Sequence, residues 1–292
     1  MAETTKHPAK LGRLARCWRG MSSALRIYLV PLGSWWCRSV DHLASNDRRA
    51  AGLVIVLPGI EGRSTLNLDI ARGLVDGGVP CSVELHDWTT GRLFYSLYHL
   101  RSTTWQARQA VRLAKRITDY QSEFPGRPVV LVGHSGGAAM SLLTLPLLED
   151  RKITGAVMLA AAVSPRYDAT AARQYVERGI WSFHSPLDWL QLGLGTLTAG
   201  TFDGKHTFSA GMVGFRDAGP RDTGLRDTGS RDSGSGDARP ATDDIAPFHQ
   251  IRYRFTMLRS WNFGGHHGWA NRLFAAEWLA PIVLEACEAA RP

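Results

Sequence analysis

The stretch VVLVGHSGGAAMSLL, residues 129–143, decides the fold of this chain. Its first half is a β-rich apolar run, and its second half starts on small residues and continues as a helix-forming sequence. Between them Ser135 lies in a G-x-S-x-G pentapeptide, whose glycines permit the sharp strand-to-helix turn that presents a nucleophilic serine. In a chain with 30 glycines the pentapeptide is expected by chance roughly 0.3 times. The interpretation of Ser135 as a nucleophile therefore depends on the segments around it.

Strand-like and helix-like segments alternate along most of the chain. Apolar runs rich in β-forming residues are predicted as strands at 53–58, 79–88, 128–133, 154–161, 179–185 and 252–261. Helices are predicted at 64–76, 101–121, 136–148, 167–177 and 268–290. Apolar strands without polar alternation are typical of a parallel sheet covered on both faces. The pattern predicts a three-layer α/β sandwich with a mostly parallel central sheet.

Positive charge is concentrated at the N-terminus. Residues 1–49 hold nine Lys or Arg residues against three acids, which accounts for +6 of the formal net charge of +8. Because the rest of the chain carries only the remaining +2, it has no global field that would attract a nucleic acid, and no nucleic-acid partner is expected. We therefore separate a basic, partly amphipathic segment, residues 1–46, from a folded domain over residues 47–292.

Within the basic segment, apolar residues recur at steps of three and four from Leu11 to Tyr28, and the arginines lie off that stripe. This spacing predicts an amphipathic helix, weakened by Gly20. A basic amphipathic helix is typical of peripheral contact with an anionic membrane, here through residues 11–30. Packing of the same stripe against the domain is the alternative interpretation.

Residues 216–246 interrupt the folded domain. They begin with four copies of a five-residue unit, RDAGP, RDTGL, RDTGS and RDSGS. Balanced charge, a glycine in every copy and little apolar surface predict a disordered insertion. The residues after it are too few for a second domain and are interpreted as the last strand and helix of the first.

No motif in the sequence indicates a metal or a cofactor, and none is expected. The four cysteines, Cys17, Cys37, Cys81 and Cys287, are widely spaced and suggest neither a zinc site nor a disulfide framework, which favours a reducing compartment. No run approaches the roughly 20 apolar residues that a membrane-spanning helix requires. We expect a cytoplasmic protein whose membrane contact, where it has any, is peripheral.

Two segments offer backbone amides that could stabilise an oxyanion beside Ser135. The amide of Gly136 opens the helix after the serine, where free amides and the helix dipole favour negative charge. The loop LPGIEGRS, residues 57–64, follows the first predicted strand. Within it the Ile60 amide is the preferred second donor and the Glu61 amide the other, although an ordinary strand-to-helix turn would have a similar sequence.

The preferred acid for orienting a histidine base is Asp188. It follows the strand predicted at 179–185, in a turn that contains a proline. Asp168 and Asp203 are the alternatives. An aspartate in a turn also commonly serves as a local cap.

The preferred base is His266, in the segment GGHHGW near the end of the chain. The preceding Gly264 and Gly265 leave room for its imidazole to approach the serine. His267 is the alternative base. A metal site is weakly supported because no further ligand stands at suitable spacing. The other histidines, including His134 inside the pentapeptide, are interpreted as positioning or surface residues.

From Leu53 to Leu284 the chain resembles α/β-hydrolases of the serine esterase, lipase and serine-aminopeptidase type. The resemblance rests on LPGIEG, GHSGG, SPLD and GGHHGW, which occur in the order found in that fold. Where many members have a His-Gly pair at the oxyanion loop, this chain has Pro58 and Gly59. The RD-rich insertion between acid and base is a second departure.

The resemblance implies a catalytic triad of Ser135, Asp188 and His266, with Ile60 and Gly136 as oxyanion donors. The implied activity is hydrolysis of a carboxylic ester in a small-molecule acyl substrate, through an acyl-enzyme. A peptidase, thioesterase or acyltransferase on the same triad is an alternative within the enzyme class. A non-catalytic scaffold with this fold is the alternative outside it.

The size of a lid and the acyl pocket can also be considered from the sequence. Hydrolases of this type commonly insert a lid before the strand that carries the acid, where this chain has only Val163–Gly179, so no large cap domain is expected. Aromatic residues in the segment after residue 85, namely Trp88, Phe94, Tyr95 and Tyr98, are candidates for lining an acyl pocket, with a place in the core as the alternative.

Overall fold

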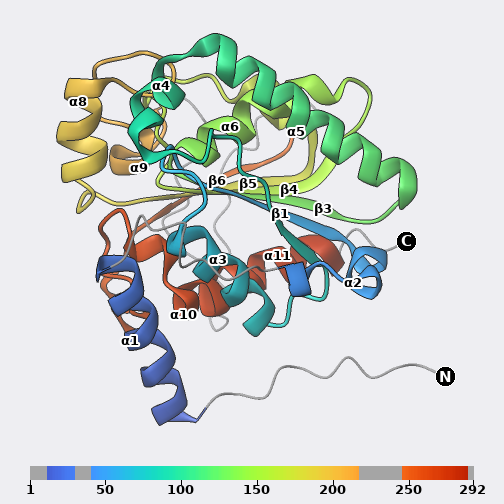
Figure 1. Ribbon diagram of the computed structural model, residues 1–292, viewed down its shortest axis with the longest axis horizontal. Helices are drawn as coiled ribbons and strands as arrows, with labels where there is room; N and C mark the ends of the chain where they lie inside the picture. Colours follow the sequence, from blue (N-terminus) through green and yellow to red (C-terminus); the bar gives the residue numbers. More distant parts are fainter. Residues whose placement is uncertain (1–11, 30–40, 217–244, 289–292) are drawn as a thin grey trace, which may run out of the picture.

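One sheet of six parallel strands organises the molecule, a computed structural model that describes residues 12–29, 41–216 and 245–288 (Figure 1). The strand order is β2-β1-β3-β4-β5-β6. The strands are β1 (Leu53–Leu57), β2 (Ser82–Leu85), β3 (Val129–His134), β4 (Ile153–Leu159), β5 (Val176–His184) and β6 (Phe248–Arg252). With helices on both faces, this sheet confirms the predicted three-layer α/β sandwich.

Helices form the outer two layers, above and below the sheet in Figure 1. One layer contains α4 (Ser96–Arg101), α5 (Thr103–Glu123), α6 (Gly136–Thr144) and α7 (Thr170–Arg173). The other contains α1 (Arg13–Leu29), α3 (Thr65–Asp76), α10 (Arg272–Phe274) and α11 (Ala280–Glu288). A short helix, α2 (Asn46–Ala51), leads into β1.

Strand β1 shows why the strands are apolar throughout. Leu53, Ile55 and Leu57 belong to the core on the α5 and α6 side of the sheet. Val54 and Val56 belong to the core on the α3 and α11 side. Successive side chains of a strand point to opposite faces, so a strand buried on both faces needs an apolar residue at every position.

The last strand differs from the prediction at 252–261. β6 ends at Arg252, and Phe255–Ser260 form a 3-10 helix. Arg252 is paired with His184, the last residue of β5, and β5 is the one described strand beside β6. The Tyr253 amide donates to the His184 carbonyl at 2.8 Å. Beyond Tyr253, no described strand lies beside the chain for it to pair with. The β-forming composition of residues 252–261 was therefore not sufficient to make this segment a strand.

Other boundaries also moved. β2 covers four residues of the predicted 79–88, and β5 begins at Val176, which shortens the helix predicted at 167–177 to α7. A register shift between β4 and β5 accommodates the added residues at the start of β5. The predicted helix 268–290 is divided into η6 (Gly268–Ala270), α10, the π-helical η7 (Ala275–Leu279) and α11.

Helix α1 packs on α3 and α10 through small residues and arginines. Gly20 and Ile27 are buried, and a Cβ atom on Gly20 would lie 2.1 Å from the Trp261 ring, so only glycine allows this approach. Three of the four arginines of the helix form ion pairs with the domain: Arg16 with Glu277, Arg19 with Asp76, and Arg26 with Asp69.

The apolar stripe of α1 faces outward as a result. Leu14, Trp18 and Leu25 are exposed, although the sequence pattern would allow them to form the packed face. The carboxylates on α3 and η7 attract the arginines, which turns the opposite side of the helix toward the domain.

The longer excursion of short helices lies between β5 and β6. The β4–β5 connection contains α7 alone, so no large cap is inserted there. After β5 come the π-helical η4 (Leu190–Gly195), α8 (Thr196–Ala199) and α9 (Ala210–Val213). The amides of Phe202, Ala210 and Gly211 bond to carbonyls of residues 161–163, which ties this excursion to the end of β4. Of the insertion predicted at 216–246, residues 217–244 lie outside the described residues.

Candidate active site

Ser135 occupies the turn between β3 and α6 in a backbone conformation that non-glycine residues rarely adopt. Its φ is 54° and its ψ is −115°. The turn is tight because α6 lies against the sheet: a Cβ atom on Gly133 would lie 2.5 Å from the Ala138 nitrogen, and one on Gly137 would lie 2.3 Å from the Leu57 oxygen. The two flanking glycines are therefore required by close backbone approach, and a strained serine is typical of a nucleophile held on a sharp turn.

The loop after β1 lies directly beside the start of α6. A Cβ atom on Gly136 would lie 3.4 Å from the Ile60 nitrogen and 2.9 Å from Ile60 Cγ2. The two candidate oxyanion donors, the amides of Ile60 and Gly136, are thus brought close together. Two such amides beside a serine can stabilise a negatively charged oxygen that develops there.

Two buried side chains hold that loop in position. Trp88 Nε1 donates to the Pro58 carbonyl at 2.7 Å, and its ring lies against Gly136. His99, also buried, has Nδ1 3.0 Å from the Ile60 carbonyl, while its Nε2 accepts from the Thr90 amide at 3.0 Å. Because a carbonyl can only accept, His99 carries its proton on Nδ1, and this tautomer fixes the Ile60 peptide. The sequence analysis grouped His99 with the histidines interpreted as positioning or surface residues, without linking it to the Ile60 peptide.

His266 and Asp188 form a hydrogen-bonded pair. His266 Nδ1 lies 2.7 Å from Asp188 Oδ2, and the Asp188 side chain is completely buried. The Nδ1 hydrogen donates to the carboxylate, so the neutral imidazole presents its Nε2 lone pair on the other side of the ring. This arrangement is suited to general-base catalysis.

The pair lies next to the nucleophile turn through His134, the residue before Ser135. His134 Nε2 donates to the His266 carbonyl at 3.0 Å, and the two rings are 4.7 Å apart. Burial, together with the positive charge that His266 can carry, lowers the pKa of His134 well below its usual value. A neutral His134 therefore buttresses the His266 loop without competing for the proton.

The pKa of His266 is raised above its usual 6.5. Burial of the imidazole by itself lowers the pKa, but the charge and hydrogen bond of Asp188, with a contribution from the charge of Glu61, outweigh the burial. An imidazolium at this position is consequently stabilised, as a base that accepts a proton during the reaction requires.

Glu61 is a second group of the site whose pKa is shifted. In the sequence, only its backbone amide was a candidate for a role. Its Oε1 accepts from the Gly59 amide at 3.2 Å. Burial raises the pKa of its carboxyl to about 7, although the Gly59 bond and the His266 charge lower it. A carboxylate inside the apolar and glycine-rich loop LPGIEG was the signal available in the sequence.

The alternative acids have structural partners of their own. Asp168 is exposed and accepts from the Thr170 amide at 2.8 Å, in a local turn at the start of α7. Asp203 accepts from the amide and hydroxyl of Ser164 and from the Thr201 hydroxyl, which closes the loop after α8. Neither lies in the His266 pair.

The alternative base also lies elsewhere. The His267 ring is 5.8 Å from the Tyr28 ring, and burial followed by the charge of His266 lowers the pKa of His267 to about 4.

Among the predicted pocket aromatics, Trp88 is buried against Phe202, whereas Phe94 is fully exposed, at 99%. Within the described residues, no cluster of three or more His, Cys, Asp or Glu side chains is arranged to hold a metal ion.

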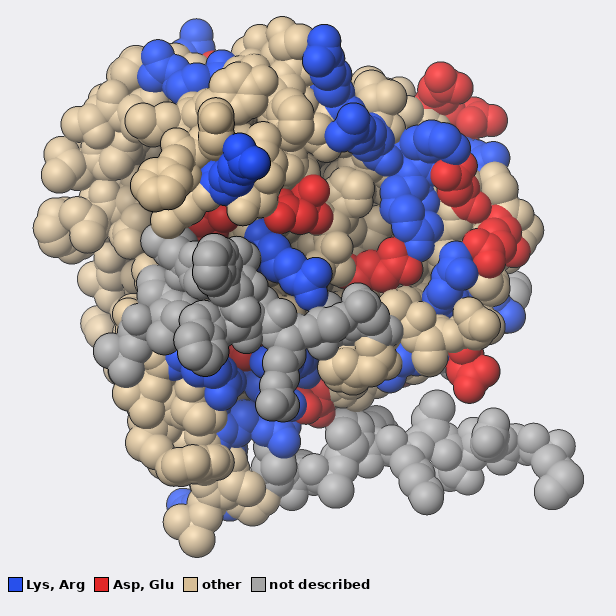
Figure 2. All heavy atoms as spheres, in the orientation of Figure 1, with Lys and Arg blue, Asp and Glu red and all other residues tan. Residues whose placement is uncertain are grey.

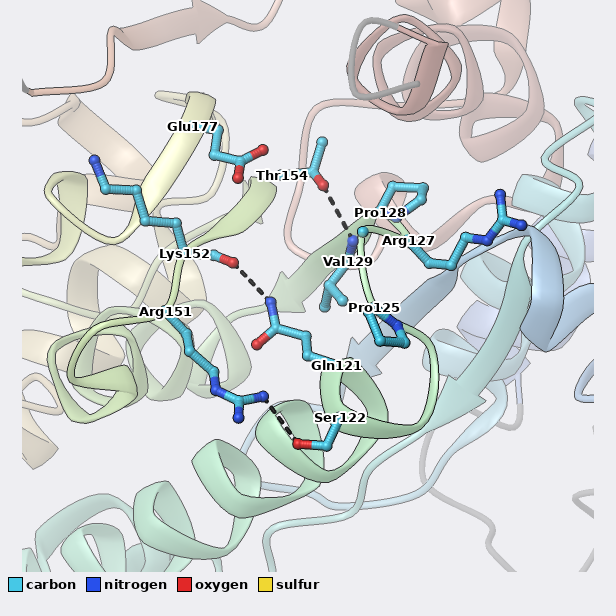
Figure 3. A pocket seen from close by; sticks show the side chains of 11 residues that line it. Gln121, Ser122, Pro125, Arg127, Pro128, Val129, Arg151, Lys152, Thr154 and Glu177 are labelled. Atoms are coloured by element: carbon cyan, nitrogen blue, oxygen red, sulfur yellow. Dashed lines mark hydrogen bonds between the residues drawn. The ribbon is translucent and has the colours of Figure 1, made fainter. Parts of the chain in front are cut away.

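A cavity of about 580 Å³ lies at the opposite edge of the sheet (Figure 3). It is formed by the end of α5 and the amino ends of β3 and β4, where the Val129 amide donates to Thr154 Oγ1 and Gln121 Nε2 donates to the Lys152 carbonyl. Ser135 follows the carboxyl end of β3, so this cavity is separate from the candidate active site.

Comparison with known proteins gives one family and several structural relatives. A model of the alpha/beta hydrolase family matches residues 27–287. A dienelactone hydrolase-like promiscuous phosphotriesterase from metagenomic libraries is 19% identical over 47% of this chain and 58% of its own, less than two thirds of its length, with a TM-score of 0.35. RedJ, solved with a polyethylene glycol molecule in its active site, is 12% identical over 91% of this chain and 98% of its own, with a TM-score of 0.39. The comparison with curated proteins found no match.

Proposed function

Because the chain belongs to the alpha/beta hydrolase family and is accordingly a hydrolase, we propose that it cleaves a carboxylic ester with Ser135 as nucleophile, His266 as base and Asp188 as orienting acid. The observation that carries the proposal is the 2.7 Å bond between His266 and Asp188, on a loop that His134 holds against the serine turn. Three residues distant in sequence are brought to one edge of the sheet in the roles that ester hydrolysis needs.

In the first half-reaction, Ser135 Oγ attacks the carbonyl carbon of the ester while His266 Nε2 takes the hydroxyl proton. Asp188 keeps the proton on Nδ1 and stabilises the imidazolium through the bond already present in the free enzyme. The carbonyl oxygen becomes an oxyanion, which the amides of Ile60 and Gly136 stabilise. As the ester C–O bond breaks, His266 returns its proton to the leaving alcohol.

In the second half-reaction, water replaces the alcohol. His266 takes a proton from the water as its oxygen attacks the acyl carbon, and then returns the proton to Ser135 Oγ when the acid leaves. The raised pKa of His266 favours the charged form that each tetrahedral intermediate requires. The net reaction adds one water across the ester bond and regenerates the serine.

Labelling with a fluorophosphonate probe tests the nucleophile. The full chain is expected to form one covalent adduct, and Ser135→Ala is expected to form none. Ser141→Ala is the matched control, since Ser141 lies on the same helix and its hydroxyl only donates to the Gly137 carbonyl. Equal labelling of the Ser135→Ala variant, or no labelling of the unmodified chain, would overturn the assignment.

A substrate panel tests the reaction class. Matched acyl esters, thioesters and amides, each with water alone or with an added alcohol acceptor, are compared for kcat/KM. Preferred cleavage of the oxygen esters supports the proposal. Preference for amides, for thioesters or for transfer to the alcohol would instead assign a peptidase, a thioesterase or an acyltransferase. Absence of turnover on all substrates, together with absence of labelling, would indicate a non-catalytic scaffold.

A further inference from the structure

Exposed large apolar side chains are gathered at one edge of the molecule. Among the described residues all of them except Val111 and Leu147 lie on α1 or on segments that follow the carboxyl ends of β2, β5 and β6. We call the exposed apolar side chains of residues 14–28, 93–98, 187–213 and 255–263 the apolar rim. Single exposed apolar residues are normal on soluble proteins, but their concentration at one edge marks an interaction surface.

The rim is continuous from α1 to α4. The ring of Tyr28 lies 6.2 Å from that of Phe263, and the side chain of Leu187 lies against Gly264. On the other side of the excursion, Arg101 of α4 donates to the carbonyl of Ala199 at the end of α8. In Figure 1, α4, α8 and α1 accordingly lie along the same side of the molecule, on the left.

Several rim side chains extend fully into solvent. The exposed fraction is 99% for Phe94, 89% for Leu14, 78% for Phe255 and 67% for Trp18. Such residues gain little from the fold and would be buried only by a further surface. Aromatic side chains are enriched where proteins meet the interface of a lipid bilayer, because one part of the ring contacts acyl chains while its edge meets headgroups.

The exposed charged side chains among the rim residues are mostly basic. Two acids lie within residues 187–213: Asp188 is completely buried, and Asp203 accepts hydrogen bonds from Ser164 and Thr201. Residues 12–29, 88–118, 189–202 and 252–276 contain no Asp or Glu. Exposed basic residues lie among the apolar ones: Arg13, Arg92, Arg101, Lys205 and Arg259. Figure 2 shows the left side of the molecule as mostly tan, with acidic side chains away from that margin. An apolar and cationic surface is complementary to an anionic phospholipid bilayer.

The rim surrounds the candidate active site. Leu187 directly precedes Asp188, and Phe263 is three residues before His266. Ser135 follows the carboxyl end of β3, at the same edge of the sheet. A bilayer resting on the rim would therefore face the edge of the sheet at which Ser135, Asp188 and His266 lie.

We propose that the apolar rim docks on an anionic phospholipid bilayer and that the ester cleaved at Ser135 belongs to an acyl lipid taken from it. The second part rests on the proposed function; the docking does not. In the reaction the serine oxygen bonds to the lipid acyl carbon, the ester C–O bond breaks, His266 delivers the proton to the leaving alcohol, and water then releases the fatty acid. The lipid alcohol leaves toward the same surface.

Vesicle flotation tests the docking. The full chain with Ser135→Ala is mixed with vesicles of phosphatidylglycerol and phosphatidylcholine in equal amounts, or of phosphatidylcholine alone, at low and at 0.5 M salt. We expect flotation with the anionic vesicles at low salt, and a loss of at least tenfold in bound fraction for the added pair Trp18→Ala and Phe255→Ala. The added pair Val111→Ala and Leu147→Ala, exposed outside the rim, is the control. Failure of the parent chain to float, or equal flotation of both pairs, overturns the docking.

Activity separates the two parts of the proposal. In the Ser135-containing chain, the pair Trp18→Ala and Phe255→Ala is expected to label with fluorophosphonate and to cleave a soluble short-chain ester as the unmodified chain does. Its hydrolysis of diacylglycerol in the anionic vesicles is expected to fall about tenfold. If the unmodified chain floats and cleaves the soluble ester but releases no fatty acid from the vesicles, the lipid substrate is overturned. If Ser135 takes no label, the proposed function fails while flotation still decides the docking.

Discussion

Nδ1 of His266 lies 2.7 Å from Oδ2 of Asp188, although 78 residues separate the two in the chain. Asp188 is completely buried at the end of β5, and the other carboxylate oxygen has no hydrogen-bond partner in the described structure. Leaving a buried carboxylate without its hydrogen-bond partner is costly, so the pairing with His266 is specific. The relationship therefore distinguishes His266 from His267, and Asp188 from Asp168 and Asp203, and it leads to predictions for each.

Replacing Asp188 by asparagine removes the charge and the tautomer control while keeping the shape. We expect kcat for ester hydrolysis to fall by about 10³–10⁴-fold, as loss of the orienting acid does in other triads. Asp168→Asn, which changes an exposed aspartate in a local turn before α7, is the control and should keep nearly full activity. Steady-state kinetics on one soluble ester compare the two, and a similar kcat for both variants would contradict the assignment of Asp188.

The two adjacent histidines are expected to differ sharply. His266→Ala removes the proposed base, and kcat should fall by at least about 10³-fold because the serine loses its proton acceptor. His267→Ala removes a ring that lies beside Tyr28, and kcat should change by less than about tenfold. Circular dichroism would be used to check that both variants fold. Equal losses in kcat, with both variants folded, would mean that His266 is not the base.

The pH dependence of activity should report the His266 imidazole. The base acts in its neutral form and its pKa is raised above 6.5, so kcat/KM should rise with pH through a midpoint above 6.5 and then level off. Glu61→Gln removes one of the charges that raise this pKa, so the midpoint should move to lower pH. Glu177→Gln, at the cavity on the opposite edge, is the control. An unmoved or higher midpoint in Glu61→Gln would refute the coupling.

Gly137, two residues after Ser135, is expected to be needed for stability. A Cβ atom on Gly137 would lie 2.3 Å from the Leu57 oxygen, so Gly137→Ala must push α6 away from the sheet. We expect the free energy of unfolding to fall by about 1–3 kcal/mol or more. Gly195→Ala, whose Cβ would meet only ordinary contacts, should change it by less than about 0.5 kcal/mol. Urea denaturation measures both, and equal stability of the two variants would show that the approach of α6 is not tight.

Local patterns were sufficient for the nucleophile turn. The run 129–133, the glycines around Ser135 and the small residues of α6 are consecutive in the chain, so one short window of sequence contains the strand, the turn and the start of the helix. The family comparison over residues 27–287 confirms the resemblance drawn from these motifs. The roles of Asp188 and His266 were predicted from their positions after strands, because the carboxyl ends of parallel strands meet at one edge of a sheet.

Features that depend on a neighbour were harder to predict. The segment 252–261 has a strand-like composition, yet β6 ends at Arg252 because β5 ends at the residue paired with it. Glu61 looked like an ordinary loop acid, since the burial that raises its pKa comes from segments remote in sequence. Strand length and carboxyl desolvation both depend on partners that no local window contains.

Helix α1 shows the difference between what a local sequence determines and what the tertiary structure determines. Its sequence determined that a helix forms and that it has an apolar and a basic side, because both follow from a 3.6-residue period. Only the tertiary structure decided which side meets the domain. Asp69, Asp76 and Glu277 bind its arginines, so the apolar side, with Trp18, is left facing solvent. A periodicity defines two faces of a helix, but the charges on the surface that receives it determine which one is buried.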